Sequence, residues 1–338
     1  MDKTIIQARK PMRMIRMAND SRVENLSFRG AWDGADDSYN QGDRHGFGVV
    51  INNVRNVALI NVGVRNQSAQ GISSSHARAL CLWNIKLARN GHRGINLSNF
   101  THQVVMHNIE GQDARLAHVL VGHGSHHVRM ANLDLKDMML TRHDERAGLH
   151  NNNAFVWLSQ GVHHVRINGV RLRQTRLHPQ MRPKGLLIAN SRNNSLRSVS
   201  MENLPIGVHL VAARVDVIYE GLPNEDTTAN TFEDIKIVAN HATPTIAAVH
   251  LTSTQKFFAP GRCGLRRLDD ADRDLLPRVR GNNFSGLKIE GYNVRFLEAP
   301  TQFWSESVPP AAFVVDGRRP RDVVRRPIKE DVRGAARW

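Results

Sequence analysis

The sequence contains little cysteine, few aromatic residues and no long apolar segment. Cys81 and Cys263 are the two cysteines among 338 residues, so both are predicted to be unpaired thiols. Aromatic residues make up 6% of the chain, and no apolar run reaches the roughly 20 residues of a membrane-spanning helix. Residues 1–17 mix charges and lack the apolar centre of a signal peptide. A disulfide-rich scaffold and a membrane protein are therefore not expected.

Acidic residues are also scarce relative to basic ones. The chain has 46 Lys and Arg against 31 Asp and Glu, which gives a net charge of +15. From Gly317 onward, seven Arg and one Lys face three acids. Such a tail is either a solvated extension or a contact for a polyanion or partner. Nucleic acid is a disfavoured partner, because no RNP-type aromatic motif, zinc-ligand spacing or helix-turn-helix is found.

A repeated phrase dominates the middle of the chain. In each copy, alternating apolar residues precede and follow a pivot residue, and the copies span 54–64, 77–87, 101–111, 125–135 and 162–172. The pivots are Asn61, Asn84, Asn108, Asn132 and Gly169, with Asn25 as an earlier member. The intervals from Asn61 to Asn132 are 23, 24 and 24 residues, which is typical of one supersecondary unit per repeat.

The repeat predicts an all-β solenoid with three short strands per turn of about 23–24 residues. Apolar residues alternate with period two, as in strands that bury one face. A near-constant repeat length returns the chain to its start about 4.8 Å further along, so equivalent strands pair in parallel. A sharp bend at the pivot requires a left-handed residue, which Asn and Gly tolerate best. Stacked Asn side chains are expected to hydrogen-bond along their column.

The repeat resembles that of the right-handed parallel β-helix in the pectate-lyase-like superfamily of polysaccharide lyases, glycoside hydrolases and phage tailspikes. The match covers roughly residues 13–300 and concerns the repeat, not the motif of one enzyme. It implies a single-stranded right-handed parallel β-helix in a secreted or virion-associated protein. The predicted segments are a capping segment at 1–12, the β-helix at 13–301 with an insert at 255–281, and a closing segment with the basic tail at 302–338.

Long segments predict a groove beside the sheet of first strands. They fall at one corner of the repeat, at 30–46, 136–153, 173–185 and 219–230. The resemblance implies that sugar chains bind in such a groove. The residues expected to point outward on its floor are Ser73, Asn96, Leu120, Val156, Leu187, His209 and His250. Their centre is apolar, and the carboxylates or metal ligands usual in pectin hydrolases and calcium-dependent lyases are missing.

Charged residues in the corner segments are the candidates for chemistry. β-Elimination of a uronic acid needs a positive group and a base, whereas hydrolysis needs two carboxyl groups about 5–5.5 Å or 6.5–9.5 Å apart. The excess of basic residues favours elimination or plain binding. The predicted catalytic residues are His143, Asp144, Glu145, Arg146, Arg173, Arg176 and His178, and the predicted substrate-binding residues are Asn96, Arg142, Arg182, Lys184, His209 and His250.

Three further groups of residues are candidates for metal binding or catalysis. No cofactor is required, but the oxygen ligands Asp33, Asp36, Asp37 and Asp43 would suit Ca²⁺, and the alternative is an ordinary polar loop. His102, His126 and His163 stack one per turn, which favours a surface file over a metal site that needs convergent ligands. His123 lies in a Gly-His-Gly sequence like that of polygalacturonases. The companion motifs of that family are absent, so a structural corner shared with Asn52, Ser98 and Ser159 is favoured.

Two functional hypotheses follow. The first is a carbohydrate-active β-helix that binds an acidic polysaccharide in the groove, with or without cleavage by β-elimination or hydrolysis. The second is a non-catalytic structural or receptor-binding β-helix, such as a virion tailspike or surface-assembly component, for which a homo-trimer is expected.

Overall fold

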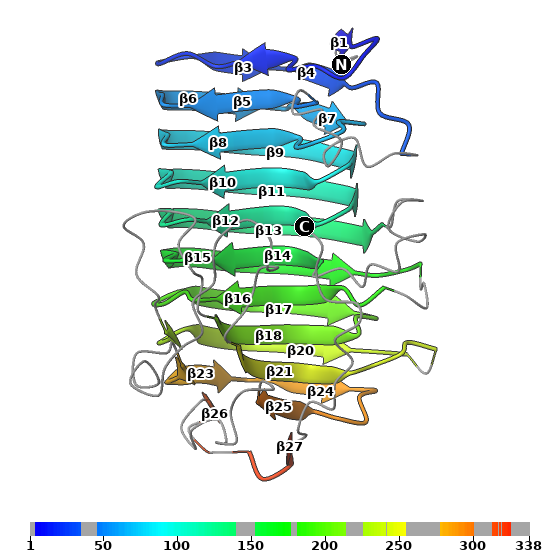
Figure 1. The fold of residues 1–338 in the computed structure, drawn as a ribbon, viewed down its shortest axis with the longest axis vertical. Helices are drawn as coiled ribbons and strands as arrows, with labels where there is room; N and C mark the ends of the chain where they lie inside the picture. The colour runs from blue at the N-terminus through cyan, green and yellow to red at the C-terminus, as the bar shows by residue number, and fades with distance from the viewer. Residues whose placement is uncertain are drawn as a thin grey trace, which may run out of the picture.

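The computed structural model is an elongated stack of parallel strands, one turn above the next from β1 to β27 (Figure 1). It describes residues 4–34, 46–139, 153–176, 181–213, 226–240, 242–254, 278–300, 313–316, 318 and 320–325. Within these ranges, all regular secondary structure is strand and no helix occurs. Accordingly, none of the described segments is a helix of the length and apolarity that a membrane crossing requires.

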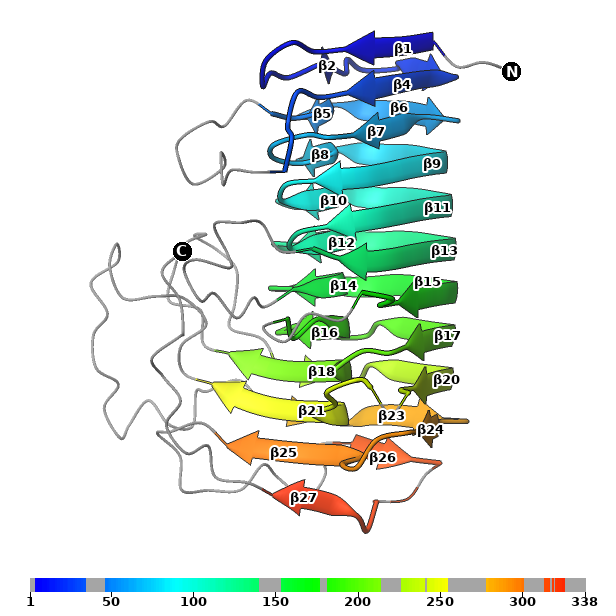
Figure 2. The same cartoon turned by 90° about the vertical axis from the view of Figure 1, so that its right-hand side faces the viewer.

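Two parallel sheets run along the stack (Figure 2). The first-strand sheet has 11 strands. They are β2 (Ile15–Arg16), β5 (Val49–Asn52), β8 (Ile72–Ser75), β10 (Arg93–Ser98), β12 (Ala117–Gly122), β14 (Ala154–Ser159), β16 (Lys184–Ala189), β18 (Ile206–Ala213), β21 (Ala247–Thr254), β25 (Phe296–Pro300) and β27 (Val323–Arg325).

The second sheet, which we call the bent sheet, has 14 strands. They are β1 (Thr4–Gln7), β3 (Arg22–Glu24), β4 (Leu26–Arg29), β6 (Arg55–Ile60), β7 (Gly63–Arg65), β9 (Arg78–Asn90), β11 (His102–Ala114), β13 (His126–Met138), β15 (His163–Arg173), β17 (Ser195–Glu202), β20 (Thr231–Val238), β23 (Asn282–Ser285), β24 (Lys288–Glu290) and β26 (Phe313–Val315). A separate pair joins β19 (Thr227–Thr228) to β22 (Val279–Arg280).

The bent sheet turns at the pivot residues. Asn84, Asn108 and Asn132 have φ of 53°, 56° and 56°, and Gly169 has φ of 69°, so the predicted left-handed conformation is confirmed. The predicted second and third strands nevertheless form one continuous strand in the central turns, such as β11. The reason is that one left-handed residue redirects the chain while the residues on both sides of it stay paired with the next turn.

Apolar side chains from both sheets fill the interior as one continuous cluster. Equivalent positions stack in columns, and Leu80, Val104, Val128 and Val165 are each paired with the next turn and at most 2% exposed. The period-two alternation seen in the sequence therefore corresponds to one buried and one outward face.

Strand pairing extends from Thr4 in β1 to Arg325 in β27. The predicted segment boundaries at residues 12 and 301 stay a prediction. Most of the insert predicted at 255–281, including the helical pattern at 265–276, lies outside the described residues. So does Cys263, whereas Cys81 is a free thiol.

Candidate functional site

The outer face of the first-strand sheet is the face on which the sequence predicts a groove. Two successive residues point inward near the start of β10 and of β16. A Cβ at Gly94 would contact Leu87 and one at Gly185 would contact Met201 in the core, and the residues that follow, Ile95 and Leu186, belong to the interior cluster. The residues before these glycines, Arg93 and Lys184, therefore lie on the outer face. Neither belongs to the buried interior cluster.

The centre of this outer face is a second apolar cluster. It consists of Ala117, Leu120, Ala154, Trp157, Leu187, Ala189 and Val211, each at most 7% exposed. The apolar centre predicted from the sequence is thus present. The assignment of Val156 to it is wrong: Val156 pairs with Val119 and Leu186 in the core, and Trp157 takes the outward position. A shift of one residue along a strand exchanges the two faces.

Basic residues lie beside this apolar centre. His209 and His250 are register partners on β18 and β21, and their rings stack with centroids 4.5 Å apart and 6° between their planes. The Nε2 of His209 is 2.9 Å from the hydroxyl oxygen of Thr252. Neither ring nitrogen of His250 has a hydrogen-bond partner among the described residues. This imidazole therefore has unused capacity to donate and accept.

Burial weakens the charged forms of these groups. It lowers the pKa of Lys184 to about 8, and burial followed by the charge of Lys184 lowers the pKa of His250 to about 4. Burial, then His250 and Lys184, holds the pKa of His209 well below its ordinary value. At neutral pH both histidines are neutral hydrogen-bonding groups, while Lys184 is largely protonated.

The central strands of the first-strand sheet are notable for the sign of their ionisable groups, whereas β25 near its end carries Glu298. On the described strands from β5 to β21, these groups are Arg93, His118, Lys184, His209 and His250, and none is acidic. His118 points inward, since a Cβ at Gly111 would lie 2.6 Å from its ring. The other four lie on the outer face, which is therefore basic on both sides of its apolar centre.

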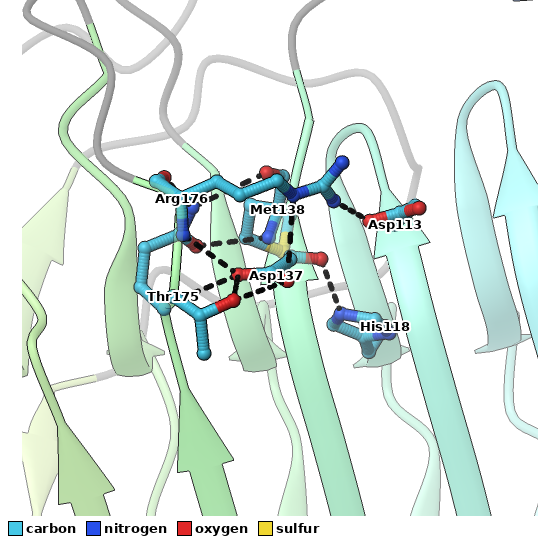
Figure 3. A network of polar contacts seen from close by, with 7 residues as sticks. Asp113, His118, Asp137, Met138, Thr175 and Arg176 are labelled. Atoms are coloured by element: carbon cyan, nitrogen blue, oxygen red, sulfur yellow. Dashed lines mark hydrogen bonds and ion pairs between the residues drawn. The ribbon is translucent and has the colours of Figure 1, made fainter.

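A second polar cluster lies at the adjacent corner, where the bent sheet leads back to the first-strand sheet (Figure 3). Asp113 and Asp137 occupy equivalent positions on neighbouring turns, flanked by the pairs Gln112–Lys136 and Ala114–Met138. Arg176 forms ion pairs with both carboxylates. Two acids and one arginine from three successive turns are thus joined at one corner.

Asp137 also binds the backbone of the next turn. Its carboxylate accepts hydrogen bonds from the backbone N–H groups of Thr175 and Arg176 at 2.6 and 3.2 Å, and from the Thr175 hydroxyl. Its own carbonyl oxygen lies 3.1 Å from Nε2 of His118, whose pKa burial lowers to about 4. These contacts tie the three turns together at the corner, and the charge of Arg176 compensates one of the two acidic charges.

The predicted site residues separate into several places. Asn96 is buried on the outer face in register with Leu120, while Arg182 lies two residues before Lys184. Arg173 lies on the bent sheet, 2.9 Å from Asp134, and so does not join Arg176 at the corner. Arg142, His143, Asp144, Glu145, Arg146 and His178 lie outside the described residues, and their roles stay predictions.

The metal and histidine predictions have different outcomes. Asp36, Asp37 and Asp43 lie outside the described residues, so the Ca²⁺ site stays a prediction. Among the residues that are described, no group of three or more His, Cys, Asp or Glu could hold a metal ion. The stacking of the histidine file is confirmed, with ring centroids of His126 4.9 Å from those of both His102 and His163.

His123 lies at a corner, as expected, with φ of 52°. The expected register is wrong by one residue, because Ser159 pairs with Gly122. Burial and the charge of Arg93 lower the pKa of His123 to about 4.

The corner acids Asp113 and Asp137 were missed by the sequence predictions. Each lies five residues after an Asn pivot, at Asn108 and Asn132. The repeat itself therefore carried a signal that placed them side by side. Counting from the pivot would have found them.

No protein-family model matches the chain, and no curated protein matches it by sequence. Solved structures do. The catalytic domain of a GH87 alpha-1,3-glucanase in complex with nigerose matches at 13% identity and a TM-score of 0.51, over 95% of this chain and 58% of that one. This chain thus spans less than two thirds of the glucanase domain.

Two further solved structures are similar over most of both chains. An alginate lyase from Paenibacillus sp. str. FPU-7 matches at 8% identity and a TM-score of 0.50, over 87% of this chain and 89% of that one. The Streptococcus pneumoniae surface protein and adhesin PfbA matches at 10% identity and a TM-score of 0.51, over 89% and 85%. At such identities the likeness shows the fold alone, which is the right-handed parallel β-helix.

Proposed function

We propose that the protein is a carbohydrate-active β-helix that binds an acidic polysaccharide along the outer face of its first-strand sheet. One observation carries this proposal: every ionisable side chain on the described strands β5 to β21 of that sheet is basic. A face with charges of one sign attracts a ligand of the opposite sign and repels a like-charged one.

The individual groups support this ligand class. Arg93, His209 and His250 are partly exposed as whole residues, whereas Lys184 is buried. Both ring nitrogens of His250 are buried and have no hydrogen-bond partner among the described residues, so a sugar hydroxyl or carboxylate that reached them would supply the missing hydrogen bond. The similar alginate lyase supports an acidic substrate by analogy of fold.

Cleavage is the finer part of the proposal. β-Elimination requires a cation beside the uronate carboxylate and a base that removes the adjacent proton, while the glycosidic bond to the leaving oxygen breaks. The predicted residues for these roles are His143, Asp144, Glu145, Arg146, His178, Arg173 and Arg176. Hydrolysis by a pair of carboxyl groups is the competing chemistry.

Binding and cleavage are tested separately. Affinity electrophoresis through gels that contain polygalacturonate or alginate measures binding, and absorbance of unsaturated uronates or release of reducing ends measures cleavage. Lys184→Met and His250→Gln are expected to weaken binding about tenfold, whereas Lys236→Met, at an exposed position on β20 of the bent sheet, is the control. Absence of binding to every acidic polysaccharide, or equal losses in Lys184→Met and Lys236→Met, would contradict the proposal.

A non-catalytic adhesin or spike is the second candidate, favoured by the likeness to a surface protein and adhesin. It predicts binding without any product from a uronate-containing polysaccharide. His143→Ala and Arg176→Ala would then leave no activity to lose, and sedimentation velocity would show the expected homo-trimer.

A further inference from the structure

A groove of about 990 Å³ runs along the outside of the bend in the bent sheet. Its long axis follows the pivot column from Asn25 in the first turns to Ser198 in β17. Strands in successive turns are about 4.8 Å apart, so the groove repeats the same chemistry at each step. It lies on a different sheet from the basic face considered above.

The pivot amides form a continuous hydrogen-bonded ladder in this groove. The Nδ2 of Asn61 donates to Oδ1 of Asn25 at 2.9 Å, Asn84 donates to Asn61 at 2.8 Å, Asn108 to Asn84 at 2.9 Å, and Asn132 to Asn108 at 3.2 Å. Each amide has two N–H groups and two acceptor sites. The ladder uses one donor and one acceptor of each interior member, and the rest are available to a ligand.

The ladder ends abruptly at Gly169. This residue takes the pivot position after Asn132 and has no side chain, so no described side chain donates to Oδ1 of Asn132. A Cβ placed at Gly169 would lie 3.1 Å from that oxygen. A hollow therefore lies at the end of the ladder, within the groove, beside an exposed acceptor that no described side chain uses.

An aromatic side chain accompanies the ladder. Trp83 precedes the pivot Asn84 and is 39% exposed. Its ring stacks on His107 with centroids 4.1 Å apart, and Nε2 of His107 lies 3.4 Å from Nδ2 of Asn132. His107 therefore covers one face of the indole. Trp83 lies beside the groove, next to the lining residue Asn84, and the rest of its exposed ring is the flat apolar surface that a sugar ring would contact.

The charges along the groove compensate one another. Its lining includes two cations, Lys86 and Arg171, and two anions, Glu110 and Asp134. Lys86 pairs with Glu110 at 2.8 Å, and Arg173 pairs with Asp134 at 2.9 Å. Such a lining gives no net attraction for a polyanion, in contrast to the first-strand face.

We propose that this groove is a separate carbohydrate site, which binds an uncharged, linear, hydroxyl-rich glycan lying along the axis of the β-helix. Sugar hydroxyls donate and accept, as the remaining amide groups of the ladder do. The hollow at Gly169 accommodates one sugar unit whose hydroxyl donates to Asn132, and Trp83 supports the face of another.

Two variants of the 338-residue chain test the site without removing its core. Gly169→Asn fills the hollow and extends the ladder, since Asn tolerates the φ of 69°. Trp83→Ala removes the stacking surface. Each is expected to weaken retardation in gels containing soluble uncharged glucans or xylan about tenfold, which corresponds to about 1.4 kcal/mol. Trp83→Phe should recover part of the binding.

Matched controls separate this site from the first-strand face and from general damage. Gly281→Asn changes another glycine with positive φ on a distant turn, and Phe100→Ala removes another exposed aromatic ring. Both, and Lys184→Met, should bind uncharged glycans as the unchanged protein does. The proposal is overturned if no uncharged glycan retards the protein, or if Gly169→Asn and Trp83→Ala bind normally. It is also overturned if sedimentation velocity shows a dimer that Trp83→Ala dissociates, because a second copy would then occupy the groove.

Discussion

The outer face of the first-strand sheet and the groove of the bent sheet are built from the same repeat but differ in almost every physical property. The first-strand face has a buried apolar centre and basic flanks. The groove is lined by amides and by charges of both signs. The molecule thus offers two separate surfaces, because its turns contribute strands to both sheets.

The two surfaces differ in how their equivalent positions vary from turn to turn. On the first-strand face, the central residues Leu120, Trp157 and Leu187 are apolar, and the same column continues with Asn96 on one side and His209 on the other. At the pivots, the same amide recurs because a left-handed conformation and a ladder partner are both required. Backbone conformation limits which residue types occur at the pivots, whereas burial limits them at the centre of the first-strand face.

The largest contrast is expected in stability. Leu187 is fully buried on the first-strand face, so Leu187→Ala should lower the free energy of unfolding by about 2–5 kcal/mol. Val105 is 42% exposed on the bent sheet, and Val105→Ala should change it by no more than about 0.5 kcal/mol. Denaturant unfolding measures both variants. Similar losses of unfolding free energy in the two variants would contradict the burial of Leu187 on the first-strand face.

Acid should destabilise the first-strand face through His250. Its folded pKa of about 4 lies below the ordinary 6.5, so between these values the unfolded chain takes up a proton that the folded chain does not. Stability is unaffected above pH 6.5 and falls as the pH drops toward 4, by roughly 2–3 kcal/mol for this group. Unfolding curves at about pH 7 and about pH 4.5 should show a smaller drop for His250→Gln. An unchanged drop would refute this assignment.

Polyanion binding should depend on pH through Lys184. Its pKa of about 8 in the free protein would rise beside a bound carboxylate, so affinity is highest below pH 8. Above it, affinity falls by up to about tenfold per pH unit until the pKa of the bound state is passed. Binding of polygalacturonate at about pH 7 and about pH 9 tests this, with Lys184→Met expected to lose the dependence. Binding of uncharged glycans in the groove should not change over that range.

The smallest expected effect concerns the ladder. Asn108→Gly removes hydrogen bonds to Asn84 and Asn132, while glycine relieves the strain of a positive φ. Asn193→Gly at φ 54° gives the same relief outside the ladder and serves as the control. The first variant should be less stable than the second by about 1 kcal/mol. No difference would mean that the ladder amides gain nothing over water.

The sequence predicted the fold because the repeat places one physical requirement at one position. The pivots at Asn84, Asn108 and Asn132 indicated the bend, the left-handed backbone conformation at the bend and the column of hydrogen-bonded side chains. It predicted three strands where the central turns have two, since periodicity cannot show whether pairing continues through a bent residue.

The candidate site was less predictable. His209 and His250 were placed on the outer face by alternation, whereas Lys184 was predicted in a corner segment and lies at the start of β16. The sequence predicted Val156 on the outer face where the structure has Trp157. The error arose because two successive residues near the start of β14, Phe155 and Val156, both point inward. Asp113 and Asp137 depend on Arg176 from a third turn, and contacts between turns follow only once the register is known.

The Asn ladder has one further consequence. All four of its hydrogen bonds donate in the same direction, from the later turn to the earlier one. The amide dipoles therefore align, with partial negative charge at the Asn132 end and partial positive charge at the Asn25 end, and each bond polarises the next. The column is a side-chain counterpart of the helix macrodipole. It gives the groove a polarity, so a glycan with distinct ends would bind in one orientation.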